Sequence, residues 1–211
     1  PRLLLYAYAR GPLFRDWARD PNLTGIVSEL LGTRDIAVVQ AHHNCIMTKY
    51  PRYGSETGWH QDIRYWSFER PVLINAWLAL GPEGPEQGGL RVPGSHRMTF
   101  SPDRFDDALF FLPDDAENRS LLANAVDIRL DPGDVLFFHC RLLHAAGCNR
   151  SAEIKRSLVF TYNRLDNPPL PDSRSARLAQ LSIARPSPAS AQRPQAEQRA
   201  GQEQPADRGA D

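Results

Sequence analysis

The chain has 211 residues, a length that suits a single domain, or one domain with a tail, and excludes a large multidomain assembly. Its 25 basic residues balance 25 acidic residues, so charge predicts neither a nucleic acid nor an anionic membrane as a partner. Hydrophobic residues make up 41% of the chain, which is enough for a core and excludes disorder over the whole length.

The first part of the chain shows helical periodicity. Apolar residues between Leu23 and Leu31 recur with the spacing of one helical face, and Gly32 follows at the position of a C-terminal cap. This pattern predicts a helix over about residues 22–31, and a weaker pattern predicts another over about 12–19. We expect both helices to cover one face of a sheet.

From Ile36 onward, short extended segments alternate with turns rich in glycine and proline. Strands are predicted at residues 36–48, 59–63, 72–80, 89–92, 126–130, 135–139 and 154–162. Because long helices do not alternate with these strands, antiparallel pairing is favoured over a parallel α/β sheet. We therefore expect a mostly β fold, a jelly-roll or cupin-like barrel with flanking N-terminal helices. A short helix is expected inside a long insertion at residues 101–125, near the entrance of the barrel.

The composition changes sharply after Ile183. Residues 184–211 contain no aliphatic residue larger than alanine, no aromatic residue and no cysteine, so they cannot build a core. We expect a disordered low-complexity tail there and a folded domain over residues 1–175.

The cysteines and the apolar runs bear on the cellular compartment. Three cysteines at irregular spacing do not predict a disulfide framework and favour a reducing environment, so we expect a cytoplasmic protein. The apolar runs are shorter than the roughly 20 residues that a membrane-spanning helix needs.

Three residues far apart in the sequence form a candidate metal site. His60 and Asp62 lie two positions apart in an extended segment, so their side chains point to the same side. His144 follows the predicted strand at 135–139 and adds a second imidazole. Two imidazoles and one carboxylate form the facial triad of non-haem Fe(II) oxygenases, which leaves metal positions open for a co-substrate and O₂. The His-X-Asp pattern alone is weak, and a surface or packing pair is the alternative.

A candidate anion-binding residue lies in the predicted strand 154–162. Strict alternation places Arg156 on the same face as the apolar residues Leu158, Phe160 and Tyr162, which we interpret as the inward face. A guanidinium inside a barrel needs an anion, and the distal carboxylate of 2-oxoglutarate would satisfy it. An internal salt bridge to Asp or Glu is the alternative.

Five runs occur in a characteristic order: 59–62 (WHQD), 73–80 (LINAWLAL), 88–97 (GGLRVPGSHR), 132–139 (PGDVLFFH) and 144–151 (HAAGCNRS). Together they resemble the phytanoyl-CoA dioxygenase family over about residues 12–175. The resemblance implies a double-stranded β-helix that holds Fe(II) and uses 2-oxoglutarate and O₂ as co-substrates. Compared with family members, the chain is expected to lack part of the N-terminal region.

The resemblance also implies roles for individual residues. His60, Asp62 and His144 match the metal ligands and form the catalytic set. Arg156 matches the arginine that holds the 2-oxoglutarate carboxylate; the family's spacing often puts this residue at Lys155, but the alternation favours Arg156. Trp77 matches a position that lines the co-substrate site in some members, with ordinary barrel packing as the alternative.

The implied reaction is hydroxylation of an unactivated C–H bond of a small molecule, with release of succinate and CO₂. Asp62 favours hydroxylation over halogenation, because halogenating relatives carry a small residue in its place. One alternative is a cupin-like metal-dependent hydrolase or isomerase, and another is an inactive barrel that binds a small acid. A buried arginine argues against the hydrolase, which has no second carboxylate to bind.

Overall fold

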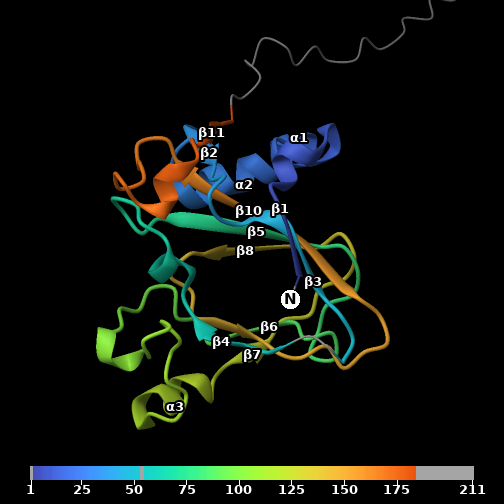
Figure 1. Cartoon of the computed structure of the whole chain (residues 1–211), viewed down its shortest axis with the longest axis vertical. Helices are drawn as coiled ribbons and strands as arrows, with labels where there is room; N and C mark the ends of the chain where they lie inside the picture. Colours follow the sequence, from blue (N-terminus) through green and yellow to red (C-terminus); the bar gives the residue numbers. More distant parts are fainter. Residues whose placement is uncertain (1, 53–54, 184–211) are drawn as a thin grey trace, which may run out of the picture.

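A computed structural model describes residues 2–52 and 55–183 of the chain, which form two antiparallel sheets with the N-terminal helices next to the larger one (Figure 1). The predicted tail at residues 184–211 lies outside the described residues. Among the residues described, no helix combines the length and the apolar character that crossing a bilayer requires.

The larger sheet has seven strands and supplies most of the core. Its central strand, β10 (Lys155–Arg164), pairs with three of the others. The other six strands are β1 (Arg2–Leu5), β2 (Ile36–Val38), β3 (Asn44–Lys49), β5 (Leu73–Ala79), β8 (Val135–His139) and β11 (Leu181–Ser182). Because β11 pairs with β2, the sheet includes residues beyond the expected domain boundary at 175.

The smaller sheet has four strands and lies opposite the larger one (Figure 1). Its strands, in spatial order, are β4 (Thr57–His60), β9 (His144–Ala146), β6 (Leu90–Val92) and β7 (Val126–Asp127). Buried side chains of both sheets meet between them, including Trp77, Val159 and Phe138 from the larger sheet and Leu90 from the smaller one. The interior of the barrel is therefore the space between the two sheets.

The two predicted N-terminal helices are confirmed and cover the outer face of the larger sheet. They are α1 (Pro12–Ala18) and α2 (Pro21–Leu31). The Asp20 side chain caps α2 by accepting hydrogen bonds from two backbone N–H groups, and Gly32 ends it in the left-handed conformation, with φ of 65°. The apolar face of α2 packs in one cluster with residues of β5 and β10. Burial of this face explains why the periodicity was readable in the sequence.

The structure differs from the sequence predictions in the strands and in the insertion at 101–125. The predicted run at 36–48 is two strands, β2 and β3, with irregular backbone between them. Strands β1, β9 and β11 were not predicted. The insertion at 101–125 does contain a short helix, α3 (Ala116–Leu122). Phenylalanines of the insertion precede that helix and pack in a cluster with Leu143. Four short 3₁₀ helices complete the described elements: η1 (Ala7–Arg10), η2 (Asp62–Tyr65), η3 (Pro102–Arg104) and η4 (Arg174–Arg177).

Candidate active site

Strand pairing brings the three predicted metal ligands together. His60 at the end of β4 is the register partner of His144 at the start of β9, and the centroids of their rings are 4.2 Å apart. Gln61 is extended, so Asp62, the first residue of η2, lies on the same side as His60. One ligand atom from each of the three residues lies within 4.8 Å of the others. The sequence prediction of this cluster is therefore supported by its geometry.

Backbone carbonyls orient both imidazoles. His60 Nδ1 lies 2.8 Å from the Gly58 carbonyl oxygen, and His144 Nδ1 lies 3.0 Å from the Leu142 carbonyl oxygen. Because a carbonyl only accepts, both Nδ1 atoms carry the proton and both Nε2 atoms keep a lone pair. These Nε2 atoms are 3.8 and 3.9 Å from Asp62 Oδ1, which is too long for hydrogen bonds and leaves space between the donor atoms for an ion.

Asp62 is held by a buried chain of hydrogen bonds across the larger sheet. Asn75 on β5 donates from Nδ2 to Asp62 Oδ2 at 2.7 Å, and Thr161 on β10 donates from Oγ1 to Asn75 Oδ1 at 2.6 Å. Asn75 and Thr161 are register partners, and all three side chains are buried. These hydrogen bonds fix one carboxylate oxygen of Asp62 and leave the other facing the histidines. Residues that hydrogen-bond to metal ligands commonly orient them in this way.

The electrostatic surroundings keep the donor atoms in the forms that bind a metal. Burial by itself raises the pKa of Asp62, but His43, His144, His60 and the Asn75 hydrogen bond together bring this pKa below its usual value. Burial, assisted by His144, lowers the pKa of His60 to about 4. At neutral pH the site therefore offers a carboxylate and a neutral His60 imidazole, and this donor set suits Fe(II).

A further histidine, not predicted as a site residue, lies beside the triad. His43 Nε2 is 3.8 Å from Asp62 Oδ1, and His43 Nδ1 is buried without a hydrogen-bond partner in the described part of the chain. Its neighbour His42 turns away and stacks on Trp66 with ring centroids 4.9 Å apart. His43 also contacts Trp66, edge to face, with ring centroids 5.2 Å apart.

A small inner cavity of about 190 Å³ extends from the triad into the barrel. Its lining includes His60 and His144 together with Trp77, Lys49 and Lys155. Both lysine side chains are buried, each residue being only 6% exposed. They are the only two lysines among the 25 basic residues of the chain. Because lysine is so rare in this chain, Lys49 could have been noticed in the sequence, but it was not predicted as a site residue.

A buried carboxylate accompanies the two lysines. Lys155 Nζ lies 3.0 Å from Glu83 Oε2, and Glu83 also accepts hydrogen bonds from Ser157 Oγ at 2.6 Å and from Trp77 Nε1 at 3.1 Å. Lys49 Nζ donates to two backbone carbonyls of the segment after His144. Burial and the nearby Lys155 lower the pKa of Lys49 to about 8. With both lysines protonated and Glu83 ionised, this end of the cavity carries one excess positive charge.

The predicted orientation of Arg156 is wrong. Arg156 is exposed and belongs to the face of β10 that packs on the N-terminal helices through Leu158 and Phe160. Lys155 lies on the opposite face, inside the barrel, with Val159. Alternation identified two faces correctly but could not say which one faces the barrel interior, because both faces of this central strand are buried.

A larger outer cavity of about 570 Å³ adjoins the triad and shares part of its lining with the inner cavity. His43, His60 and Asp62 belong to its lining. The remaining lining is largely apolar and aromatic, with two arginines: Leu3, Leu5, Tyr6, Tyr65, Trp66, Phe110, Leu178, Arg174 and Arg177 contribute to it. The candidate metal site is therefore reached from two cavities of different character.

Comparison with known proteins gives a family match over most of the chain. The model of the phytanoyl-CoA dioxygenase family matches residues 4–157. A probable phytanoyl-CoA dioxygenase of Caenorhabditis elegans is 25% identical over 164 residues, which are 74% of this chain and 52% of that protein. An L-proline trans-4-hydroxylase of Streptomyces griseoviridis is 28% identical over 174 residues, covering 72% of this chain and 63% of the relative. The chain thus spans between about half and two thirds of the length of these relatives.

Solved structures share the fold. EctD from S. alaskensis with bound Fe superposes with a TM-score of 0.72 and 24% identity, covering 88% of this chain and 68% of that one. The epimerase SnoN, in complex with Fe3+, alpha ketoglutarate and nogalamycin RO, gives a TM-score of 0.69 and 20% identity, covering 80% and 65% of the two chains. These likenesses confirm the predicted double-stranded β-helix.

Proposed function

Because the chain belongs to the phytanoyl-CoA dioxygenase family, we propose that it is an Fe(II)- and 2-oxoglutarate-dependent dioxygenase that hydroxylates a small molecule. One observation carries the proposal: a single buried cavity is lined by two of the metal-ligand histidines and by the only two lysines of the chain. A cavity that contains both a metal site and a buried positive charge suits 2-oxoglutarate, which can chelate the metal with one end and present a carboxylate to the lysines with the other.

His60, Asp62 and His144 would hold the Fe(II) ion. The fit rests on the donor set, two imidazole nitrogens and one carboxylate oxygen, and on the hydrogen bonds that aim these atoms at one another. When bound, Fe(II) and 2-oxoglutarate supply the oxidising chemistry: one atom of O₂ enters a C–H bond of the substrate, the other enters succinate, and CO₂ leaves.

Lys155 and Lys49 would bind the distal carboxylate of 2-oxoglutarate. Glu83 neutralises one of the two positive charges, so one charge remains for one carboxylate. Glu83 also holds Lys155 in place. Trp77 packs beside Lys155, with Lys155 Nζ 4.8 Å from the centroid of the indole. A metal-dependent hydrolase or isomerase has no second carboxylate to bind, so the buried lysines favour the dioxygenase over that alternative.

The substrate would enter through the outer cavity. That cavity is lined by His60 and Asp62 but by neither lysine, so the substrate would reach the metal from it while the co-substrate binds the lysines of the inner cavity. Its apolar walls would exclude water from the reacting C–H bond. Relatives of the chain include an L-proline trans-4-hydroxylase and an ectoine dioxygenase of Bordetella parapertussis, which is consistent with a substrate set by the cavity walls.

Release of labelled CO₂ from carboxyl-labelled 2-oxoglutarate tests the proposal. The full chain is incubated with Fe(II), ascorbate, O₂ and a panel of small molecules, beside the Asp62→Ala variant. We expect iron-dependent release that rises with a suitable panel member and equals background in Asp62→Ala. Release by the wild-type chain that never exceeds that of the variant would contradict the proposal.

A further inference from the structure

The mouth of the outer cavity carries two arginines outside the region that the family model matches. Arg174 and Arg177 lie on η4, whereas the match ends at residue 157. The family-model match therefore does not cover them. Both arginines are exposed, and both line the cavity whose lining also contains His60 and Asp62.

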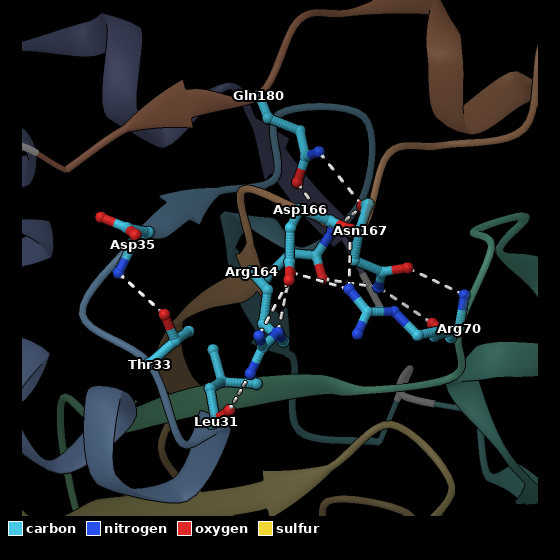
Figure 2. A network of polar contacts seen from close by, with 9 residues as sticks. Leu31, Thr33, Asp35, Arg70, Arg164, Asp166, Asn167 and Gln180 are labelled. Carbon is cyan, nitrogen blue, oxygen red and sulfur yellow. Dashed lines mark hydrogen bonds and ion pairs between the residues drawn. The ribbon is translucent and has the colours of Figure 1, made fainter.

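The segment that leads to η4 is fixed to the sheet by a polar network (Figure 2). Asp166 lies between Arg70 and Arg164, with contacts of 2.7 and 2.8 Å to their nitrogens. Asn167 accepts from the Arg70 backbone N–H at 2.8 Å and donates to the Arg70 carbonyl oxygen at 2.9 Å. These bonds connect the chain after β10 to the loop before β5 and limit where η4 can lie.

A second anchor lies within η4 itself. Ser175 is 1% exposed, and its Oγ accepts a hydrogen bond from the Ser67 backbone N–H at 2.9 Å and lies 2.7 Å from His42 Nε2. His42 in turn stacks on Trp66, which lines the cavity. A buried serine between two arginines of the same short helix thus holds both at the cavity mouth.

In the part of the chain that the structure describes, neither guanidinium has an acidic or hydrogen-bonding partner. Four other arginines, Arg70, Arg91, Arg104 and Arg164, form ion pairs with acidic residues. Within residues 2–52 and 55–183, Arg174 and Arg177 form neither an ion pair nor a side-chain hydrogen bond. A guanidinium presents donors that fit the oxygens of a carboxylate or a phosphate. Two unpaired guanidinium groups at one cavity mouth are suited to such an anion.

The rest of the cavity specifies the body of the ligand. Tyr65 and Phe110 form one part of the lining, and Leu3, Leu5 and Tyr6 form another. All of these side chains present apolar or aromatic surface, and the volume of about 570 Å³ lies within the usual range for small-molecule sites. An apolar body would lie between these residues and reach the floor of the cavity.

We propose that the primary substrate is an amphipathic anion whose acidic group binds Arg174 and Arg177 while its apolar body lies in the outer cavity with a C–H bond at the metal site. The substrate role rests on the proposed function, whereas binding of the anion depends only on the arginines and the cavity. A carboxylate and a phosphate monoester share the chemistry that the arginines recognise.

Binding of three eight-carbon probes to the metal-free full chain tests this inference. Octanoate, octyl phosphate and the neutral octanamide are titrated by calorimetry into the wild type and into Arg174→Gln/Arg177→Gln. We expect at least one anion to bind about tenfold more tightly than octanamide, as charge-assisted hydrogen bonds predict. In the double variant this preference should disappear while octanamide binding stays unchanged. Preference for one anion over the other identifies a carboxylate or a phosphate substrate.

The matched control is Arg34→Gln/Arg97→Gln, which removes the same charge from two exposed arginines outside the cavity lining. This control should keep the preference for anions, and circular dichroism should show all variants folded. Equal binding of anions and octanamide by the wild type would overturn the inference, as would a preference that survives in Arg174→Gln/Arg177→Gln because the probes bind the lysines. Because no metal is added, either failure is distinguishable from a failure of the proposed iron chemistry.

Discussion

The two cavities that meet at the His60–Asp62–His144 site are built from different parts of the fold. The inner cavity is lined largely by residues of the strands β3, β4, β5, β9 and β10, and its charged groups are buried. The outer cavity is lined by the end of β1, the segment after β2, the insertion before α3, and η4. Sheet residues thus form the part proposed to bind the co-substrate, while connecting segments form most of the part proposed to select the substrate, where variation is tolerated.

Removing a metal ligand should abolish the function of both cavities. In Asp62→Ala we expect Fe(II) affinity to fall more than about 100-fold, because loss of a ligand should exceed the effect typical of losing a residue that only orients a ligand. Anaerobic calorimetry with Fe(II) measures this, with the exposed histidine variant His96→Ala as control. Unchanged Fe(II) affinity in Asp62→Ala would mean that the triad is not the metal site.

Removing Lys155 should affect the inner cavity alone. In Lys155→Met we expect 2-oxoglutarate affinity to fall about 30-fold or more, because a buried charged partner is lost. The variant should also lose about 3–5 kcal/mol of folding free energy, because Glu83 is left buried without its cation.

The double variant Lys155→Met/Glu83→Gln separates these two effects. It should regain most of the stability in chemical denaturation, since neither member of the buried ion pair is left charged without its partner, but not the affinity for 2-oxoglutarate. Recovery of both stability and affinity would assign Lys155 a structural role only. Octanoate binding in the outer cavity should be unaffected by either variant.

The inner cavity should also respond to pH near the pKa of Lys49. This pKa is about 8, so the ammonium group is charged at pH 7 and loses its proton as the pH rises. If its charge supports binding, 2-oxoglutarate affinity should fall about tenfold from pH 7 to pH 9. Lys49→Met should bind weakly at both pH values. An affinity in the wild type that is the same at pH 7 and pH 9 would contradict this role.

The smallest effect is expected at Arg156, on the outer face of β10. Because this side chain is exposed on the side away from the barrel interior, Arg156→Ala should leave 2-oxoglutarate affinity and stability almost unchanged. Calorimetry and thermal melting measure the two quantities. A loss of affinity similar to that of Lys155→Met would restore the original sequence prediction.

Local patterns in the sequence predicted the elements that carry their own signal. Helix α2 has a capping aspartate, an apolar stripe and a terminal glycine, all within thirteen residues of sequence, so its prediction needed no tertiary information. The spacing of His60 and Asp62 likewise placed both side chains on one side, but this pattern alone is weak evidence for a metal site. Adding His144 required the order of several motifs, because its partnership with His60 arises from strand pairing.

The sequence could not predict what depends on tertiary packing. Both faces of β10 are buried, one by helices and one by the opposite sheet, so alternation alone placed Arg156 on the wrong side. The pairing of Lys155 with Glu83 joins distant segments, and neither residue carries a local sign of it. The strand prediction over 36–48 also missed the irregular backbone that carries His42 and His43, both of which contact Trp66.

The central claim is that one ligand bridges the metal triad and the two lysines. Anaerobic addition of Fe(II) and 2-oxoglutarate to the full chain, followed by visible absorption spectroscopy, tests it most directly. We predict a charge-transfer band from chelation of Fe(II) by the 2-oxoacid, present in the wild type and Arg156→Ala. At the same ligand concentration it should be absent from Asp62→Ala and strongly reduced in Lys155→Met/Glu83→Gln. A wild-type chain that binds Fe(II) but gives no band, or a band of equal strength in all four proteins, would contradict the account.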